Sequence, residues 1–319
     1  MATYRTDLTS VGPVMIVADL SASDLRDALH AGLKLRTGPV VTQIQSTLPE
    51  VVAGIALHYA NHPVEAHNGF ADFHVRIAKP KGLRHWFQPQ VLFFFDNEPP
   101  FHPLPANQAF PMLEWGLNWC VSNLCHQYIS IHAAVLERNG KALVLPAPPG
   151  SGKSTLCAGL LHHGWRLLSD ELALINPATL AITPLPRPVS LKNASIDVIK
   201  EFAPTAVMNP PVHDTIKGTV AHMRPPASAL IHAGEKALPG WLVLPQYTPE
   251  ADAILAPLSK ARALMALIEN SFNFNLHGEQ GFTALANWIE ASDSYTFTYS
   301  SLDEAVPIFD ELAERAHTA

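Results

Sequence analysis

Residues 147–154 read APPGSGKS and match the phosphate-binding loop pattern G-x-x-x-x-G-K-[ST] everywhere except at the first position, where Ala147 replaces glycine. Glycine lets such a loop turn so that consecutive backbone N–H groups point at one centre, and the helix that follows presents its positive end to the same anion. We expect the loop to bind the phosphates of ATP. The alternative is a glycine-serine turn that only happens to precede a helix, and the missing first glycine favours that alternative. The residues expected to contact the nucleotide are Pro149, Gly150, Ser151, Gly152, Lys153, Ser154 and Thr155.

Two side chains of this loop have distinct expected roles. Lys153 would contact the β and γ phosphates as a mobile cation, and the Ser154 hydroxyl would be a ligand of Mg²⁺. The motif follows the apolar run KALVLPA and opens a stretch of helical character, which is the context that the pattern requires. The sequence therefore predicts ATP and Mg²⁺ as cofactors, with Lys153 acting in catalysis.

An acidic pair, Asp170-Glu171, follows the loop at a distance that allows contact with it. Asp170 lies 17 positions after Lys153, enough for one helix, a turn at Gly164 and a short returning strand. A carboxylate at that place can bind Mg²⁺ or accept the proton of an attacking hydroxyl. The sequence therefore predicts Asp170 as a catalytic residue, and both acids, with Ser154, as metal-site residues; the alternative for the pair is a helix cap or an exposed turn.

His132 lies inside the apolar run ISIHAAVL, on the strand before the one that leads into the loop. A lone histidine on a strand is more often a core residue than a catalyst. The position of this strand next to the loop strand is what keeps a catalytic role for His132 open. The other histidines show no HExxH or other tight metal-binding spacing.

The elements that must position these residues follow the order strand, loop, helix, strand. ISIHAAVLE and KALVLPA are joined by Asn139-Gly140, which predicts a hairpin. The helix after the loop stops at Gly164, and WRLLSDELALI reads as a strand ending in acids. We expect residues 176–240 to form strands with functional loops. Beyond them the pattern predicts a strand at WLVLP, helices around SKARALMALIEN and FTALANWIE, a strand at YTFTYS and a final helix capped by Ser301 with Glu304.

The first third of the chain has a different pattern, and we expect a domain boundary near residue 125. A helix begins after Ser21, with Asp24 in its cap, and its apolar spacing continues until Gly38. PVVTQIQ, DFHVRIA and QVLFFF read as strands of a small, partly antiparallel sheet, and a helix from Pro111 leads into the second domain.

Composition excludes several classes of protein. The chain has 319 residues, 48% of them hydrophobic and 15% charged, with a net charge of −7, so it is a folded chain with no overall attraction for nucleic acid or anionic lipid. Every apolar run is broken before the roughly 18 residues of a spanning helix, and no basic-then-apolar stretch opens the sequence, so we expect a cytoplasmic protein with no membrane contact. Three cysteines without a CxxC pair argue against disulfides and a cysteine zinc site.

The ordered set SIHAAVLERNG, PPGSGKST, HHG and LLSDE resembles the HPr kinase/phosphorylase family. The resemblance covers about residues 126–235. It implies an α/β fold: a C-terminal phosphate-loop kinase domain of the HPr kinase/phosphoenolpyruvate carboxykinase-like type, residues 126–319, with a smaller N-terminal α+β domain, residues 1–125. It also implies that Asp170 is the base that deprotonates an acceptor serine, and that His132 helps to position it. Glu171 stands where the family commonly has a second aspartate.

The segments RPVSLKN and KGTVAHMRPP resemble the subgroup called HPr-kinase-related kinase A, and the family's glycine-rich second signature is absent. The subgroup is associated with small peptide-chaperone partners of the PqqD type, so the resemblance implies a peptide or protein partner. HPr itself is therefore not predicted as the substrate. Family members are often oligomers, so the resemblance suggests a homo-oligomer. The sequence itself does not determine the oligomeric state. The N-terminal domain is expected to be a platform for substrate or partner.

Four basic residues in these later segments are candidates for phosphate or substrate contacts: Arg187, Lys192, Lys217 and Arg224. Phosphoryl transfer uses extra cations to stabilise its transition state. The alternative is that each is a solvated surface charge.

These observations predict an ATP-dependent kinase that transfers the γ phosphate to a hydroxyl, that of serine or threonine in a peptide or protein, with Asp170 as general base. A small-molecule hydroxyl is the close variant. The alternative from another class is a sensor or assembly module that binds ATP and transfers nothing. A carboxykinase-type lyase would need metal-ligating Lys, His and Asp on separate strands, and the sequence does not show that set.

Overall fold

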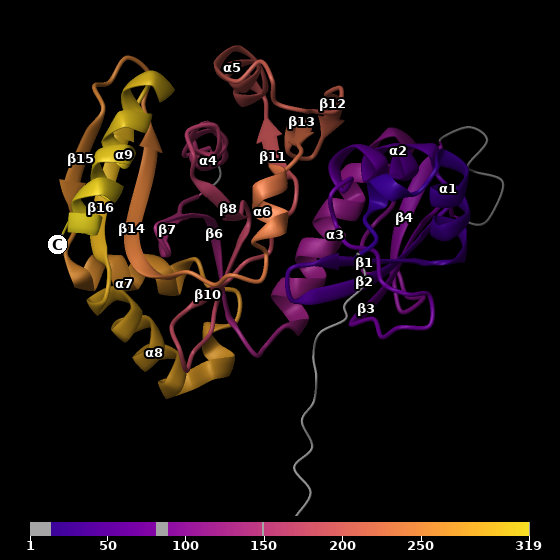
Figure 1. Ribbon diagram of the computed structural model, residues 1–319, viewed down its shortest axis with the longest axis horizontal. Coiled ribbons are helices and arrows are strands. Elements are labelled where there is room, and N and C mark those ends of the chain that lie inside the picture. Colours follow the sequence, from indigo (N-terminus) through magenta and orange to yellow (C-terminus); the bar gives the residue numbers. More distant parts are fainter. Residues whose placement is uncertain (1–13, 81–88, 149, 319) are drawn as a thin grey trace, which may run out of the picture.

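The computed structural model describes residues 14–80, 89–148 and 150–318, and its fold is mixed α/β. The strands form a five-stranded, an eight-stranded and a three-stranded sheet. Figure 1 shows the first sheet and its helices, indigo to magenta, beside the rest of the chain. We call residues 14–124 the N-terminal unit and residues 125–318 the C-terminal unit. Pro149, expected to contact nucleotide, lies outside the described residues.

The N-terminal unit is a small sheet covered by helices. Its strand order is β1-β2-β3-β4-β5, with β2 and β3 parallel and the other neighbours antiparallel, which confirms the expected partly antiparallel sheet. The strands are β1 (Leu33–Thr37), β2 (Val40–Ser46), β3 (Phe73–Ala78), β4 (Gln90–Phe95) and β5 (Leu104–Pro105). The helices are η1 (Val17–Asp19), α1 (Ala22–Ala31), α2 (Pro49–His58), η3 (Ala106–Gln108) and α3 (Ala109–Leu124).

The first long helix is shorter than its apolar spacing suggested. The Ser21 side chain accepts a hydrogen bond from the Asp24 N–H and caps α1, as predicted. The expected end at Gly38 is wrong, because Gly32 adopts a left-handed backbone with φ of 108° and ends the helix. Leu33, which continued the helical spacing, instead opens β1 and is buried in the sheet.

The C-terminal unit is built on the eight-stranded sheet, in the order β10-β9-β6-β7-β14-β16-β15 with β8 also paired to β6. The predicted hairpin joins β6 to β7, and its turn residues Asn139 and Gly140 have φ of 55° and 78°. Because β7, β14 and β16 are parallel, their carboxyl ends lie at one edge of the sheet. The strands are β6 (Ile129–Arg138), β7 (Lys141–Pro146), β8 (Arg166–Ser169), β9 (Leu172–Ile175), β10 (Ile182–Thr183), β14 (Leu238–Tyr247), β15 (Ile254–Pro257) and β16 (Asp293–Tyr299).

Helices cover both faces of this sheet. Along β6, Ala134 and Leu136 pack with α4, α6 and α9, whereas Ala133 and Val135 pack with α7 and α8, so alternate residues serve two cores. Burial on both faces explains why these strands read as continuous apolar runs. The helices are α4 (Lys153–Leu161), α5 (Ala194–Phe202), α6 (Ala227–Ile231), α7 (Lys260–Glu269), α8 (Phe274–Glu290) and α9 (Leu302–Thr318). The Ser301 hydroxyl accepts a hydrogen bond from the Asp303 N–H at the start of α9.

Two expectations for the middle of the chain are wrong. The segment WRLLSDELALI is not one strand: β8 ends at Ser169, the acidic pair follows it directly as expected, and β9 begins at Leu172. Both strands pair with β6 around a register shift. Residues 176–240 are not only strands and loops, because they include α5 and α6 beside the small sheet β11-β13-β12. The strands of that sheet are β11 (Val189–Lys192), β12 (Val212–Thr215) and β13 (Gly218–Met223).

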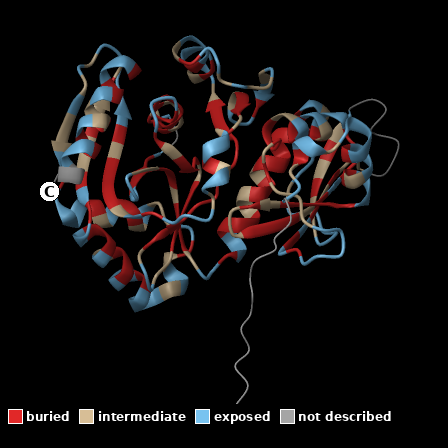
Figure 2. Ribbon diagram, in the orientation of Figure 1, coloured by how far each residue is buried: buried red, intermediate tan, exposed pale blue. Residues whose placement is uncertain are grey.

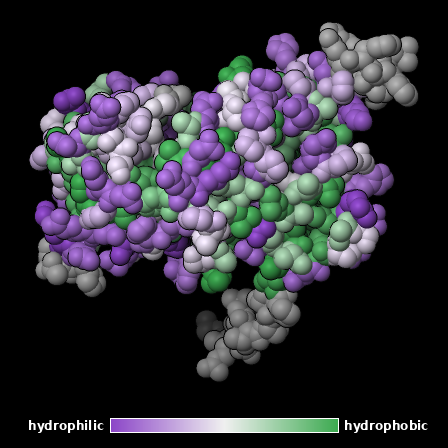
Figure 3. Space-filling model, turned by 90° about the horizontal axis from the view of Figure 1, so that it is seen from above, coloured by the Kyte–Doolittle hydropathy of each residue, from purple (hydrophilic) through white to green (hydrophobic). Residues whose placement is uncertain are grey.

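The two units share a buried boundary. The core of the N-terminal unit includes Leu172, Leu174 and Leu185 of the C-terminal unit, and Figure 2 shows buried ribbon in both units. Seen from above, hydrophilic residues cover much of the molecule, with hydrophobic residues gathered between them (Figure 3). Among the described residues, no helix combines the length and apolarity needed to cross a membrane.

Candidate functional site

The predicted phosphate loop lies at the carboxyl edge of the eight-stranded sheet. It connects the end of β7 to the start of α4, beside the last residues of β14 and β16, Tyr247 and Tyr299. A cavity of about 320 Å³ opens there and is lined by loop residues 150–155, by α5 and by these two tyrosines. Ligands of open α/β sheets bind in such crevices outside the carboxyl ends of the strands.

The loop backbone depends on its two inner glycines. Gly150 and Gly152 have φ of 88° and 86°, in the left-handed region that favours glycine. The Tyr299 hydroxyl donates to the Gly152 carbonyl at 2.8 Å, and the Tyr247 N–H donates to the Ser151 carbonyl at 2.9 Å. No side chain among the described residues caps the N-terminus of α4, so its N–H groups and positive end face the cavity without an internal partner.

Lys153 and His132 contact each other inside the site. The Lys153 Nζ lies 3.1 Å from the His132 Nε2, and Lys153 is only 8% exposed. Burial, together with the Lys153 charge, lowers the pKa of His132 to about 4, so the ring is neutral near pH 7. A neutral ring that accepts at Nε2 carries its proton on Nδ1, which then donates to the Glu171 carbonyl at 3.2 Å. Burial also lowers the pKa of Lys153 itself.

Asp170 is buried beside the predicted phosphate loop, 3% exposed, and is not among the residues that line the cavity. Its Oδ2 accepts hydrogen bonds from the Ser154 hydroxyl at 3.2 Å and from the Ser190 backbone N–H at 3.0 Å. Its Oδ1 is buried and has no hydrogen-bond partner among the described residues. Burial and the neighbouring Glu171 charge raise the pKa of Asp170 to about 6. The side chain therefore holds an unused acceptor oxygen and titrates close to neutral pH.

The pKa of Glu171 shifts in the opposite direction, although Glu171 is the neighbour of Asp170 in the sequence. Its carboxylate oxygens lie 3.9 Å from the Lys192 Nζ and 3.6 Å from the His132 Nδ1. Burial acts to raise the pKa of Glu171, but the Lys153 and Lys192 ammonium groups outweigh it and hold that pKa below its usual range. Glu171 therefore carries a permanent negative charge that balances the lysines of the site.

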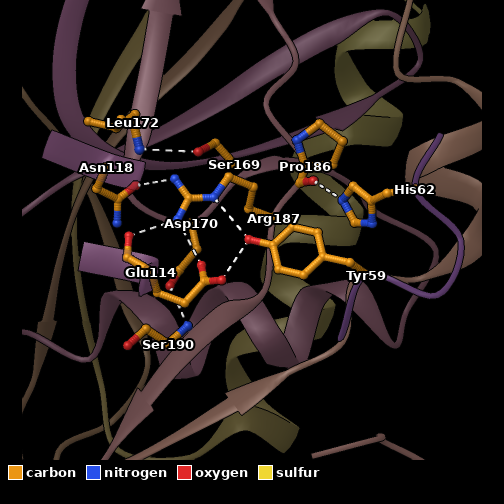
Figure 4. A network of polar contacts seen from close by, with 10 residues as sticks. All are labelled: Tyr59, His62, Glu114, Asn118, Ser169, Asp170, Leu172, Pro186, Arg187 and Ser190. Atoms are coloured by element: carbon orange, nitrogen blue, oxygen red, sulfur yellow. Dashed lines mark hydrogen bonds and ion pairs between the residues drawn. The ribbon is translucent and has the colours of Figure 1, made fainter. Parts of the chain in front are cut away.

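Of the four basic candidates, Lys192 lines the cavity, and Lys217, Arg187 and Arg224 do not. Lys217, in the turn between β12 and β13, extends its Nζ over the Trp115 ring of α3 at 5.1 Å from the centroid, and its charge helps to lower the pKa of Glu171. The Arg224 Nε donates to the Leu57 carbonyl of the N-terminal unit, and the Arg187 guanidinium is buried against α3 (Figure 4). The last two therefore join the units instead of facing a phosphate.

The expected metal site fits Mg²⁺ only with help from a nucleotide. Among the described residues, no group of three His, Cys, Asp or Glu side chains could hold a metal ion. Ser154 and Asp170 supply a hydroxyl and a carboxylate 3.2 Å apart, and the second Asp170 oxygen is unpaired. Mg²⁺ is commonly held by one or two protein oxygens together with phosphates and water, so this donor set fits that mode of binding. The Glu171 carboxylate faces Lys192 and His132.

Sequence reasoning missed several residues of the site. Tyr247 and Tyr299 end two parallel strands in register with each other, but their neighbourhood depends on a pairing that no local pattern reveals. Ser190, whose N–H donates to Asp170, is not among the predicted site residues either. Ala194, Ser195 and Val198 of α5 also line the cavity. The sequence could have predicted α5, because its two buried residues, Ile196 and Ile199, are apolar and lie at helical spacing.

No protein-family model matches the chain, and no curated protein is significantly similar to it. The resemblance to HPr kinases therefore stays a prediction.

Proposed function

We propose that this chain is an ATP-dependent kinase of the phosphate-loop type that transfers the γ phosphate to a hydroxyl, that of serine or threonine in a peptide or protein. The observation that carries the proposal is the environment of Asp170. A buried carboxylate with a free oxygen, a pKa of about 6 and a place directly beside Ser154 has the properties of a general base for a hydroxyl.

The cavity favours a nucleotide over a simple anion. The uncapped start of α4 and the ammonium groups of Lys153 and Lys192 supply the anion-binding part. Tyr247, which is 44% exposed, and the exposed Val198 supply apolar lining to the same cavity. A cavity with both kinds of lining suits a ligand that joins a flat, apolar base to a polyphosphate.

The roles of the residues follow from these contacts. Lys153 would leave His132 for the β and γ phosphates, a short movement of a flexible side chain with a positive charge. Before nucleotide binds, the neutral His132, oriented through Nδ1 by the Glu171 carbonyl, would hold that lysine beside the loop. When bound, Mg²⁺ would neutralise phosphate charge, held on the protein side by Ser154 and Asp170. The Asp170 carboxylate would take the proton of the acceptor hydroxyl.

An ATP-binding module without transfer is the other candidate. Such a module would also use Asp170 to hold Mg²⁺, so the unpaired Asp170 oxygen fits both candidates. The pKa of about 6 favours the kinase, because carboxylates whose pKa is moved close to neutral pH occur preferentially at catalytic sites.

The test is transfer of label from γ-labelled ATP with Mg²⁺ to protein in a cell lysate, followed by identification of the labelled residue. We expect a serine or threonine phosphoester. Asp170→Asn should lower the rate by about 10²- to 10⁴-fold while ATP still binds, because only the proton acceptor is lost. Lys153→Met should lower the rate and, unlike Asp170→Asn, should also weaken ATP binding.

Asp197→Asn is the matched control, since it makes the same chemical change on an exposed side chain of α5. It should leave the rate unchanged. Full transfer by Asp170→Asn would exclude Asp170 as the base. ATP binding without any labelled acceptor, in the wild-type protein, would favour the module that only binds.

A further inference from the structure

A continuous chain of contacts connects the N-terminal unit to Asp170. It begins at Glu114 of α3, passes through the Arg187 side chain, and continues along the backbone to Ser190, whose N–H donates to the Asp170 Oδ2 (Figure 4). Only two residues, 188 and 189, separate Arg187 from Ser190. The start of β11 therefore lies between a fixed side chain and the proposed base.

Arg187 is fixed on every side by the N-terminal unit. Its Nη2 donates to the Glu114 carboxylate at 2.7 Å and to the Glu114 carbonyl at 2.9 Å, and its Nη1 donates to the Asn118 side chain at 2.9 Å. The Tyr59 hydroxyl donates to the other Glu114 oxygen at 2.6 Å. Arg187 is 6% exposed, so these bonds are shielded from water.

The residue before Arg187 is held as well. Burial lowers the pKa of His62 to about 4, so this ring is neutral near pH 7, and its Nε2 lies 2.9 Å from the Pro186 carbonyl, which can only accept. Residues 186 and 187 are thus both tied to the N-terminal unit through side chains that are buried on each side of the boundary.

The Ser190 N–H has a special place among the contacts of Asp170. Within the described part of the chain, the carboxylate accepts only two hydrogen bonds, from Ser154 and from Ser190. Ser154 is the residue proposed to turn toward Mg²⁺. The Ser190 N–H cannot bind a metal ion, so its hydrogen bond to Asp170 remains when Mg²⁺ is bound and fixes the direction of the carboxylate.

We propose that Arg187 is a positioning residue of the kinase site, which transmits the rigidity of α3 through the start of β11 to the carboxylate of Asp170. The inference rests on the proposed function for its catalytic consequence, but its structural step is independent of it. It gives the N-terminal unit a part in the chemistry, because the position of the base depends on a residue that this unit holds.

The first measurement is hydrogen exchange of the Ser190 amide, followed by NMR in the full-length protein. The Arg187 Nε also donates to the Tyr59 hydroxyl, at 3.4 Å. Arg187→Lys keeps the charge, but one ammonium group cannot contact Glu114, Asn118 and Tyr59 together. We expect the Ser190 amide to exchange at least about tenfold faster in this variant, while the core amides of β7 keep their rates. Tyr59→Phe removes only one hydroxyl from the network and should give a smaller change in the same direction.

Gln108→Ala is the control, because the Gln108 side chain also bridges the two units, donating to the Asp214 carbonyl at 3.0 Å, but far along the chain from Ser190. It should leave Ser190 exchange unchanged. The second measurement is phosphoryl transfer: Arg187→Lys should lower kcat by about 10- to 100-fold with the KM for ATP unchanged, since a displaced base affects the reaction and not nucleotide binding.

Unchanged Ser190 exchange in both Arg187→Lys and Tyr59→Phe would overturn the inference. Equal acceleration of the β7 amides would overturn it too, by showing a general loss of stability. Local acceleration with an unchanged kcat would remove the catalytic consequence. If the wild-type protein transfers no phosphate, the proposed function fails, while the exchange measurement still decides whether Arg187 holds the donor to Asp170.

Discussion

At the scale of single residues, the informative feature is that two adjacent carboxylates titrate in opposite directions. Burial and the charge of Glu171 raise the pKa of Asp170 to about 6, while Lys153 and Lys192 overcome burial to lower the pKa of Glu171. Environments that separate the pKa values of neighbouring acids are how one site obtains a proton acceptor and a permanent charge. Asp170 suits the first role and Glu171 the second.

This difference predicts the pH dependence of the phosphoryl transfer that we propose. Asp170 can accept a proton only when it is ionised, so kcat should fall as the pH drops through about 6 and reach a plateau above pH 7. The measurement is a pH–rate profile with ATP affinity determined at each pH, which separates titration of the nucleotide from titration of the enzyme. A flat kcat between pH 5 and pH 7.5 would contradict the assignment of Asp170.

At the scale of elements, the loop between β7 and α4 is shaped by backbone conformation and by close contact with two strand ends. Gly150 and Gly152 have nearly the same positive φ, 88° and 86°. They differ in their surroundings: a Cβ at Gly150 would meet nothing within 4 Å, whereas a Cβ at Gly152 would lie 2.9 Å from the Tyr247 Cβ and closer still to the Tyr299 hydroxyl. The second glycine is therefore required by packing as well as by conformation.

Alanine substitution of each glycine separates these two requirements. Gly150→Ala should destabilise the protein by about 1–2 kcal/mol, the cost of a left-handed residue with a side chain. Gly152→Ala should cost about 1–3 kcal/mol more, because the tyrosines must move, and it should weaken ATP binding more than the first variant does. Urea unfolding and calorimetric binding check both values. Equal effects of the two substitutions would show that Tyr247 and Tyr299 do not restrain the loop.

At the scale of the whole molecule, the boundary between the units is rich in buried polar groups. The ion pair of Arg187 and Glu114 crosses this boundary. Three histidines are buried at it, each at most 1% exposed: His58, His62 and His222. The His58 Nε2 contacts the Asn209 side chain at 3.1 Å, while neither ring nitrogen of His222 has a partner among the described residues. Burial is the main reason why the pKa values of His58 and His62 are lowered to about 4 and that of His222 to about 3.

These histidines predict a loss of stability in mild acid. Each has a folded pKa below its unfolded value of about 6.5, so the unfolded chain binds more protons between pH 4 and pH 6.5 and folding weakens as the pH falls through that window. Each histidine contributes a slope of up to about 1.4 kcal/mol per pH unit. The raised pKa of Asp170 has the opposite effect: below pH 6 its protonation favours the folded state and cancels the contribution of about one histidine. Urea unfolding at pH 7.5 and pH 5 measures the net change.

His222→Leu provides the control for this prediction, since it removes one titrating ring and two unpaired nitrogens while keeping a similar volume. It should reduce the pH dependence of the unfolding free energy by about one proton and leave the stability at pH 7.5 equal or higher. An unchanged pH dependence in this variant would show that His222 is not buried as a neutral ring.

Local patterns predicted most elements of the fold and part of the site. The hairpin turn at Asn139-Gly140, the strands that end in Pro146 and Tyr247, and the Ser21 cap are all set by neighbours in sequence, and the structure contains them. The errors arose where tertiary packing outweighed a local pattern. Leu33 fits a helix by spacing but is buried as a strand residue in β1.

Residue types and their spacing are enough to predict the parts whose geometry is local: glycines that permit positive φ, a lysine and a serine that open a helix, and acids one strand further on. Which of these groups meet depends on the packing of the whole chain. Asp170 reaches Ser154 and Ser190 because β8 and β9 both pair with β6, and Arg187 faces α3 because two units bury a common boundary. Strand neighbours and buried partners depend on how the whole chain removes apolar surface from water, and no short segment carries that information.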